Sequence, residues 1–452
     1  MSNYIGNRGY TIYKENLSRS QLNDLRKELM VKPFVNKQFC QEPQPFPVYL
    51  ESKKKIYIPK FYGLKYFGNP ENNKINSGKD INVKFSLDLR ENQKPVAKKF
   101  LKEANNSGGG IISVPCGFGK TVLALYILSK LGKKALVIVH KSFLMEQWKE
   151  RIEFFLPNAR IGKIQGNVIK IKDMDIVLGM LQSISMRDYD SDIFDDFGFV
   201  IYDECHHLGA EVFSRSLLKV QSKYTLGLSA TPQRSDGLSK VFEWYLGGIV
   251  YLIKKREQEE VNVKIIKYYS DNLQYSDIKT SYRNGQTITN MPSMINNICL
   301  FPERTNIIID EIKICINEKR KILVLSDRRE HLKIIKETLD KNNVCSTGYY
   351  LGGMKQEELK KTEEKDLMLG TFSMASEGFD CKELNTIIFA SPKSNIEQSV
   401  GRILRMKKEE RKCVPLVIDI WDDFSLFSRQ GEKRLKFYKK NNYNINIIDL
   451  VK

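Results

Sequence analysis

The stretch Gly110-Ile111-Ile112-Ser113-Val114-Pro115-Cys116-Gly117-Phe118-Gly119-Lys120-Thr121 decides the fold of this chain. It opens with a short apolar, β-branched run that predicts a buried strand. A Pro/Gly loop follows, and Lys120-Thr121 then open an apolar run, residues 122–131, that Gly132 stops. Strand, glycine loop, Gly-Lys-Thr and helix in this order are the arrangement of a phosphate-binding loop.

Each residue type in this loop has a physical reason for binding phosphate. Gly117 and Gly119 let backbone N–H groups approach phosphate oxygens, and the helix N-terminus adds partial positive charge. Lys120 is expected to reach the β- and γ-phosphates of ATP, and the Thr121 hydroxyl to ligate Mg²⁺. The first glycine of the full pattern would fall at position 114, which is Val. Taken alone, the stretch could also be a glycine-rich turn between core elements.

The composition is that of an ordinary globular protein. The 452 residues, of which 41% are hydrophobic and 28% charged, are enough for two or three domains. No apolar run approaches the length of a membrane span and no secretory leader is evident, so we expect an intracellular protein without membrane contact. The eight cysteines are scattered without a C-x₂-C pair, which argues against a zinc module.

The net charge of +19 suits a polyanionic partner, and nucleic acid is the commonest one. A Lys-rich composition inherited from an AT-rich genome is the competing explanation, because Asn, Ile and Lys are all abundant. Charge alone therefore supports nucleic-acid binding without establishing it.

Residues 1–84 predict a small α+β accessory module. Short aromatic and β-branched runs at 9–13, 47–50 and 55–63 read as strands around one helix near 18–30. Lysines and tyrosines mix here in a way that could serve phosphate contact and base stacking on DNA: Lys53, Lys54, Lys55, Tyr57, Tyr62 and Tyr66. A solvated basic hairpin over a small core is an equally good interpretation.

From residue 85 the chain alternates strand-like and helical runs, which predicts an α/β domain with a parallel sheet over 85–250. Ligands of such sheets bind at the carboxyl ends of the strands. Past the apolar run 199–202 stands Asp203-Glu204-Cys205-His206-His207, and past the next strand stands Ser229-Ala230-Thr231. Asp203 is expected to hold Mg²⁺, and Glu204 to orient and deprotonate the attacking water.

A second α/β domain without its own phosphate loop is predicted over 305–452, after an inter-domain segment with an insertion at 251–304. Within the segment, 254–260 is a charge run that predicts a solvated helix face. In the second domain, Gln398 begins Gln-Ser-Val-Gly-Arg-Ile-Leu-Arg on a predicted helix. Arg402 and Arg405 would share one helix face and meet a γ-phosphate. The basic tail from 428 predicts a final helix.

In this order the motifs resemble those of the superfamily two helicases and translocases. The resemblance runs from Leu89 to about Trp421 through Leu-Arg-x-x-Gln, Pro-Cys-Gly-Phe-Gly-Lys-Thr, Asp-Glu-Cys-His, Ser-Ala-Thr-Pro, Gly-Phe-Asp and Gln-x-x-Gly-Arg-x-x-Arg. It implies two RecA-like parallel-sheet domains in tandem, here with the small N-terminal module, with ATP between them and nucleic acid across both.

The resemblance also assigns roles residue by residue. It implies adenine contacts from Arg90 and Gln93, Mg²⁺ binding by Thr121 and Asp203, and the hydrolytic base at Glu204. It implies nucleotide binding by Pro115, Cys116, Gly117, Phe118, Gly119, Lys120 and Thr121. It implies coupling of hydrolysis to movement through His206, Ser229 and Thr231, and an interdomain ribose and coupling motif at Gly378 and Asp380. Gln398, Arg402 and Arg405 would complete the ATP site.

Val-Pro-Cys-Gly-x-Gly-Lys resembles the XPB-like branch of the superfamily, in which Val at 114 is expected. The N-terminal segments 7–12 and 57–63 are similar to viral members, including the poxvirus transcript-release helicase. Arg234-Ser235-Asp236 lacks the central Glu of the XPB separation motif, which puts an XPB-style wedge role in doubt.

The function implied is an ATP-dependent DNA helicase or translocase, moving 3′ to 5′, in viral transcript release or repair. Partners would be DNA, and RNA polymerase or other transcription or repair factors, in the virion or the viral factory in the cytoplasm. An RNA helicase of the Asp-Glu-x-His type and a nucleic-acid clamp that barely hydrolyses ATP remain the alternatives.

Overall fold

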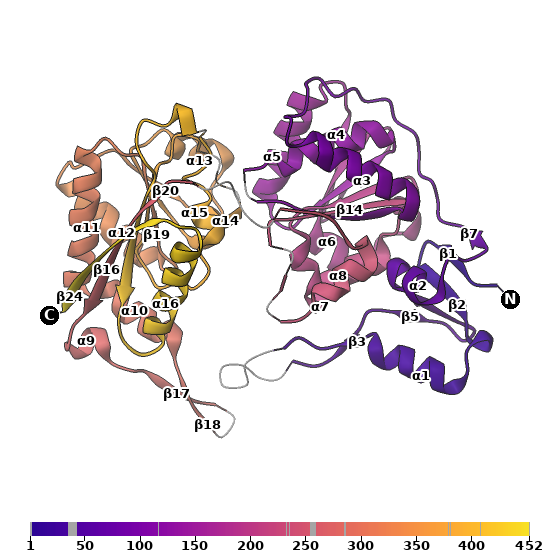
Figure 1. The fold of residues 1–452 in the computed structure, drawn as a ribbon, viewed down its shortest axis with the longest axis horizontal. Coiled ribbons are helices and arrows are strands. Elements are labelled where there is room, and N and C mark those ends of the chain that lie inside the picture. The colour runs from indigo at the N-terminus through magenta and orange to yellow at the C-terminus, as the bar shows by residue number, and fades with distance from the viewer. Residues whose placement is uncertain are drawn as a thin grey trace. The chain divides into compact units, whose positions relative to one another are not determined.

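The computed structural model describes residues 2–34, 43–115, 117–231, 233–234, 236–253, 259–283, 286–377, 379, 381–406 and 408–451. The chain divides into two compact units, Met1–Lys255 and Arg256–Lys452. Each unit is built around a large parallel β-sheet (Figure 1). None of the described helices is long and apolar enough to cross a membrane.

The first unit begins with a small α+β module. Its sheet has the order β5-β6-β2-β1-β7, with β1 (Tyr4–Gly6), β2 (Gly9–Tyr13), β5 (Leu50–Glu51), β6 (Lys55–Ile58) and β7 (Asn72–Asn73). A second, two-stranded sheet is formed by β3 (Met30–Val31) and β4 (Phe46–Pro47), and the helices are α1 (Arg19–Glu28) and α2 (Lys60–Phe67). The sequence predicted strand through Gly63, and this is wrong from Lys60 onward.

The module shares its core with the larger domain that follows it. The Tyr245 hydroxyl donates to Val48 O at 2.6 Å, and the Tyr62 ring packs edge-on against Trp244 with the ring centroids 5.2 Å apart. The buried Lys60 ammonium donates to Lys223 O at 3.1 Å. Apolar residues of both parts form one buried cluster, so the module is fixed to the first domain by apolar packing and by hydrogen bonds.

The large sheet of the first unit has eight strands in the order β11-β10-β12-β9-β13-β14-β8-β15. All pair in parallel except β11 with β10. The strands are β8 (Gly109–Ser113), β9 (Ala135–Val139), β10 (Ile161–Gln165), β11 (Val168–Lys170), β12 (Ile176–Met180), β13 (Phe199–Tyr202), β14 (Tyr224–Ser229) and β15 (Ile249–Leu252). The helices are α3 (Lys94–Ser107), α4 (Lys120–Leu131), α5 (Ser142–Phe155), α6 (Leu181–Met186), α7 (Glu211–Lys219) and α8 (Ser239–Leu246).

Both faces of this sheet are covered. Alternate residues of β9 belong to different cores, since Leu136 packs with residues of α7 and α8 and Val137 packs with residues of α3, α4 and α5. Strands buried on both faces must be apolar throughout, which is why they read as uninterrupted runs in the sequence. The expected parallel α/β fold is confirmed.

The second unit has a seven-stranded, fully parallel sheet in the order β20-β21-β19-β22-β23-β16-β24. Its strands are β16 (Asn262–Tyr269), β19 (Ile322–Leu325), β20 (Thr347–Tyr350), β21 (Leu367–Gly370), β22 (Thr386–Phe389), β23 (Leu416–Asp422) and β24 (Asn444–Val451), and a separate hairpin comprises β17 (Thr280–Arg283) and β18 (Gln286–Thr289). Its helices are α9 (Leu273–Ser276), α10 (Met291–Leu300), α11 (Pro302–Asn317), α12 (Arg329–Lys341), α13 (Gln356–Glu363), α14 (Phe372–Glu377), α15 (Glu397–Val400) and α16 (Ser425–Lys440).

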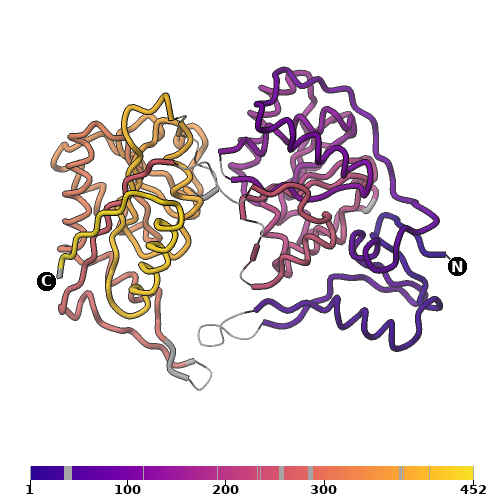
Figure 2. Tube along the Cα trace, in the orientation of Figure 1, coloured from indigo at the N-terminus to yellow at the C-terminus, as the bar shows by residue number. Residues whose placement is uncertain are grey.

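Two strands of this sheet differ from expectation. Residues 251–304 were expected to lie between domains, yet they contribute β16 to the second sheet, side by side with β24 (Figure 2). The basic tail forms the expected helix, α16, and then adds β24. The charge run 254–260 was expected to be helical, and its first five residues lie outside the described residues.

Two buried ion pairs fix β23 within the second unit. Arg304 holds Asp422 through two hydrogen bonds of 2.6 and 2.9 Å, and both side chains are fully buried. Arg434 pairs with Asp419 at 2.8 Å. Arg304 also donates to Ala390 O at the end of β22. Since a buried charge is tolerated only when it is paired and hydrogen-bonded, these contacts lock neighbouring strands and helices together.

Candidate ATP and nucleic-acid site

The glycine loop leads from β8 into α4 with the backbone geometry that the sequence predicted. Gly117 and Gly119 have φ angles of 84° and 93°, a region that L side chains rarely adopt. A Cβ at Gly119 would lie 2.6 Å from Gln93 Nε2, so the loop also lacks space for one. Lys120 is the first residue of α4. Cys116, expected to contact phosphate, lies outside the described residues.

Gln93 supports the loop from outside. Its side-chain amide donates to Phe118 O at 2.8 Å, and its Oε1 accepts the Arg90 N–H at 3.1 Å. Gln93 is buried whereas Arg90 is exposed. The structure therefore gives Gln93 a positioning role on the loop, and the adenine contacts expected of both residues stay predictions.

The acidic pair follows directly on β13, next to the loop. Asp203 accepts the Trp148 indole N–H at Oδ2 over 2.8 Å and the Glu204 backbone N–H at Oδ1 over 3.1 Å. Glu204 Oε1 lies 3.8 Å from Lys120 Nζ. Burial, and then the adjacent Glu204 carboxylate, raise the pKa of Asp203. A cation beside it would oppose that rise, because it favours the ionised carboxylate.

The same cluster reaches the end of β14. His206 Nδ1 lies 3.4 Å from Glu204 Oε2 and 3.0 Å from Ser229 Oγ. Ser229 Oγ in turn accepts the Thr231 N–H at 3.1 Å. The expected coupling residues, His206, Ser229 and Thr231, are thus brought together with Glu204. They form one polar chain that starts at Lys120.

Two residues of the cluster were missed. Trp148 sits on α5 among Leu144, Met145 and Ile152, and this stripe reads as ordinary core, so nothing local signals its bond to Asp203. Arg234 donates to the backbone carbonyl of His206 and pairs with Asp236. In the sequence, the segment 234–236 was notable only because it lacks the central Glu of the XPB separation motif.

In the second unit the structure corrects the expected arginine helix. Helix α15 ends at Val400, and turns follow through residue 404, so Arg402 and Arg405 do not share a helix face. Arg402 is buried and donates to Ala375 O at 2.7 Å and to Phe379 O at 3.1 Å. Gln398 and Arg405 are half-buried. Gly378 and Asp380 lie outside the described residues.

The donor set fits Mg²⁺-bound triphosphate. The Thr121 hydroxyl and Asp203 carboxylate are hard oxygen donors of the kind that Mg²⁺ prefers, and Mg²⁺ on nucleotides takes few protein ligands. Among the described residues, no three His, Cys, Asp or Glu side chains gather closely enough to hold a metal by themselves. Lys120 and the narrow glycine loop suit the phosphates.

Family comparisons agree with this geometry. Residues 86–234 match the family described as type III restriction enzyme, res subunit, and residues 303–407 match the helicase conserved C-terminal domain. A putative ATP-dependent RNA helicase of Acanthamoeba polyphaga mimivirus is 36% identical over 97% of this chain and 85% of its own length. A putative helicase of invertebrate iridescent virus 6 is 28% identical over 80% of this chain and 83% of its own.

A phage relative and one solved structure were also found. A probable helicase of Escherichia phage T5 is 30% identical over 74% of this chain and 72% of its own length. The crystal structure of T4 UvsW covers 96% of both chains at 18% identity with a TM-score of 0.37. The chain belongs to the superfamily two helicases, as an ATP-dependent nucleic-acid helicase related to those of large DNA viruses.

Proposed function

We propose that this helicase acts on DNA, coupling ATP hydrolysis to 3′ to 5′ movement along a strand in viral transcript release or repair. The observation that carries the hydrolytic part is the polar chain Lys120–Glu204–His206–Ser229, with Lys120 Nζ 3.8 Å from Glu204 Oε1 and His206 Nδ1 3.0 Å from Ser229 Oγ. Such a motor needs a cation that binds phosphate, a base that accepts a proton, and a hydrogen-bonded link to a neighbouring strand.

Each of these residues takes one task in the proposed reaction. ATP would supply the bond to be hydrolysed, and Mg²⁺, which Thr121 and Asp203 would hold, would neutralise charge on its phosphates. Lys120 neutralises phosphate charge, and Glu204 orients a water and accepts its proton. His206 lies within reach of the Glu204 carboxylate and the Ser229 hydroxyl, so a change at Glu204 is passed to β14.

The test uses nucleic-acid-stimulated ATP turnover. Lys120→Ala and Glu204→Gln should each lower the stimulated rate by about a hundredfold or more, because each removes a group that acts on the transition state. Wild-type turnover in either variant would contradict the site. A phosphate-release assay on the wild type also separates the motor from a clamp that barely hydrolyses ATP.

An RNA substrate is the second candidate, because the mimivirus relative is named an RNA helicase. The DNA proposal rests on the resemblance to the XPB-like branch and on the restriction-enzyme family that matches the first unit. Matched DNA and RNA strands of one sequence should be compared as stimulators of ATP turnover. Stimulation by RNA alone would reverse the choice of substrate.

The N-terminal module offers an additional contact for a single strand. Register places Thr11 opposite Tyr57 and Tyr13 opposite Lys55, so these residues share the sheet face opposite the core residues Ile12 and Ile56. Cations lie over the tyrosines of this face: Lys55 over Tyr13 at 4.8 Å, Lys74 over Tyr4 at 4.7 Å and Arg8 over Tyr57 at 5.3 Å. Aromatic faces flanked by cations suit stacked bases and phosphates.

Not every tyrosine expected at this contact is available. Tyr62 is buried against Trp244, and its hydroxyl donates to Glu28 at 2.6 Å, so stacking by Tyr62 is excluded in this structure. Tyr66 lies on α2 and not on the sheet.

RNA polymerase is the protein partner that transcript release requires. Recovery of polymerase subunits with the native protein from viral factories or virions would support that role and location.

A further inference from the structure

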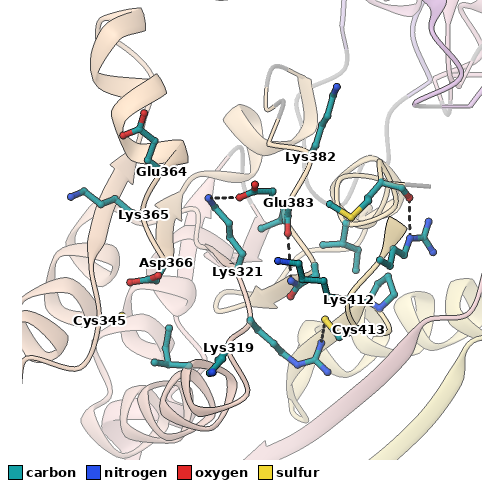
Figure 3. A pocket seen from close by; sticks show the side chains of 18 of the residues that line it. Lys319, Lys321, Cys345, Glu364, Lys365, Asp366, Lys382, Glu383, Lys412 and Cys413 are labelled. Carbon is teal, nitrogen blue, oxygen red and sulfur yellow. Dashed lines mark hydrogen bonds and ion pairs between the residues drawn. The ribbon is translucent and has the colours of Figure 1, made fainter. Parts of the chain in front are cut away.

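The second unit contains a cavity of about 530 Å³ at the edge of its sheet where the strands begin (Figure 3). Four lining residues directly precede strands: Lys321 before β19, Asp366 before β21, Asn385 before β22 and Pro415 before β23. The helicase motifs of this unit begin after the opposite, carboxyl ends of β21 and β22, and Ile403 and Met406 return to the cavity. The volume is that of a small-molecule site, which typically spans about 300–1,000 Å³.

Cations outnumber carboxylates around this cavity. Its lining includes Lys319, Arg320, Lys321, Lys365, Lys382, Arg411 and Lys412, against Glu364, Asp366 and Glu383. Three of the cations are already paired, Arg320 with Glu318 at 2.6 Å, Lys321 with Glu383 at 3.3 Å and Arg411 with Glu259 at 2.7 Å. The other four, Lys319, Lys365, Lys382 and Lys412, are exposed and form no ion pair with any described residue, and in Figure 3 the Lys365 and Lys382 side chains extend outward from the lining.

The three lining carboxylates, Glu364, Asp366 and Glu383, offset only part of this positive charge. Glu383 is engaged by Lys321, and Asp366 accepts the Ser346 hydroxyl at 2.6 Å and the Ser346 N–H at 3.1 Å. Those bonds, with Lys321 and Lys365 nearby, hold the pKa of Asp366 below its usual range. Lys319, Lys382 and Lys412 therefore have positive charge to offer a ligand, and phosphate groups are the ligand chemistry that clustered lysines suit.

Part of the lining is apolar. Leu384 and Ile403 are almost completely buried beneath the cavity, and Ile316, Val344, Met406 and Pro415 add further apolar surface. A simple inorganic anion would gain nothing from this surface. A ligand that joins phosphates to a flat, largely apolar base would use both parts of the lining.

The cavity adjoins the segment that carries the predicted ATP-site arginines. Ile403 and Met406 line it, and each directly follows one of them, Arg402 or Arg405. Arg411, another lining residue, donates to Met406 O at 3.0 Å. A molecule in the cavity would thus contact the segment whose Arg402 is bonded to Ala375 O and Phe379 O.

We propose that this cavity is a second nucleotide site, which takes a nucleoside phosphate independently of the glycine loop and acts on the segment 402–406. Binding at the cavity stands on its own lining. Its regulatory effect rests on the proposed ATPase roles of Arg402 and Arg405.

Equilibrium dialysis of the full chain with ADP tests the binding. The wild type should bind two equivalents. The double variant Lys382→Ala/Lys412→Ala should still bind one equivalent of ADP with wild-type affinity. Its affinity for the second equivalent should fall by about tenfold or more, since two charge-assisted contacts are lost. The variant Lys433→Ala/Lys436→Ala removes the same charge from exposed positions of α16 and should still bind two. One equivalent for the wild type, or two for Lys382→Ala/Lys412→Ala, would overturn the proposal.

A second background separates this site from the glycine loop. Lys120→Ala/Thr121→Ala should lose one equivalent and keep the other, and adding Lys382→Ala/Lys412→Ala should abolish binding. In the Lys120→Ala/Thr121→Ala protein, ADP should slow amide hydrogen exchange in peptides that cover residues 401–413. No change there overturns the effect on the segment. Unaltered binding by Lys120→Ala/Thr121→Ala would instead contradict the proposed ATP site.

Discussion

His206 Nδ1 lies 3.0 Å from Ser229 Oγ, a contact between residues 23 positions apart in the chain. His206 belongs to the acidic motif that follows β13, and Ser229 is the last residue of β14. Ser229 is completely buried and its hydroxyl also accepts the Thr231 N–H. Because both segments are hydrogen-bonded to the same hydroxyl, a displacement of either segment alters the hydrogen bonding of the other.

Ser229→Ala should therefore uncouple ATP hydrolysis from unwinding. The variant loses two hydrogen bonds, each worth about 0.5–1.5 kcal/mol, and leaves the Thr231 N–H without its acceptor. We expect the number of base pairs opened per ATP hydrolysed to fall severalfold, while ATP turnover falls less. Parallel measurements of strand separation and phosphate release give this ratio.

Ser222→Ala provides the matched control. Ser222 is also buried, and its hydroxyl donates to Tyr224 O at 2.6 Å, at the opposite end of β14. It should lower stability by about the worth of one hydrogen bond, ~0.5–1.5 kcal/mol, and leave the ratio unchanged. A ratio that fell equally in both variants would assign the effect to stability alone.

Trp148→Phe should make ATP hydrolysis more sensitive to acid. The indole N–H donates to Asp203 and lowers its pKa, so its removal raises the pKa of Asp203 further. Only the carboxylate binds Mg²⁺ well, and the acidic limb of the rate profile should therefore move to higher pH. Along the acidic limb, the Mg²⁺ concentration for half-maximal rate should rise by up to about tenfold, the usual worth of a hydrogen bond to a charged group.

Saturating Mg²⁺ should restore the wild-type profile of Trp148→Phe, because the metal competes with the proton for Asp203. The acidic limb of each profile is measured at low and at saturating Mg²⁺. A shift that persists at saturating Mg²⁺ would show that Trp148 acts on some other group.

Lys60 should make folding stability depend on alkaline pH. Burial lowers the pKa of Lys60 from 10.5 to about 8, so between these values the unfolded chain binds more protons than the folded one. Stability from this group is thus present above pH 10.5 and is lost as pH falls through 8. Relative to Lys60→Met, the wild type should gain up to ~3 kcal/mol of unfolding free energy across this window.

Urea unfolding of the wild type and Lys60→Met at several pH values from 7 to 10.5 measures this difference. Other groups titrate in both proteins and cancel in the comparison. A constant difference across the series would mean that Lys60 keeps an ordinary pKa in the folded state.

Arg304→Met should destabilise the second unit by ~3–5 kcal/mol, the usual effect of breaking a buried ion pair. It leaves Asp422 buried without its cation and frees Ala390 O. The double variant Arg304→Met/Asp422→Asn should be more stable than the single one, because the uncompensated charge is gone. Denaturant unfolding of the wild type and both variants measures their unfolding free energies. A double variant that is no more stable than Arg304→Met would show that the uncompensated charge of Asp422 is not the cause of the destabilisation.

Tyr57→Ala should weaken binding of a single strand by about tenfold, since stacking one base on an aromatic ring is worth about 1–3 kcal/mol. Fluorescence anisotropy of a labelled oligonucleotide gives the affinity, and a melting curve checks that the module stays folded. Tyr66→Ala removes an exposed tyrosine from α2, away from the sheet face, and should bind normally. Equal losses in both variants would contradict a specific role for that face.

Sequence patterns predict this fold where local chemistry suffices. The strands β9 and β13 are apolar runs buried on both faces, and glycines at positive φ mark the loop before Lys120, so both are readable from the chain. The acidic motif and Ser229 could be placed together because carboxyl ends of parallel strands meet at one edge.

The same reasoning could not predict contacts between segments that are distant in the sequence. No pattern links Trp148 to Asp203, or β16 to β24, since each depends on packing that only the complete fold defines. The arginine segment was misjudged for another reason. Its spacing fits a helix, but bonds from Arg402 to Ala375 O and Phe379 O hold it in turns instead.

The position of β16 has a mechanical consequence. The connection between the two units leads into this strand, which is bonded along its length to β23 on one side and β24 on the other. A force along the axis of β16 would load both ladders in shear, so that many evenly spaced hydrogen bonds would resist at once instead of opening one by one. The second unit would therefore resist a force that the chain transmits along β16.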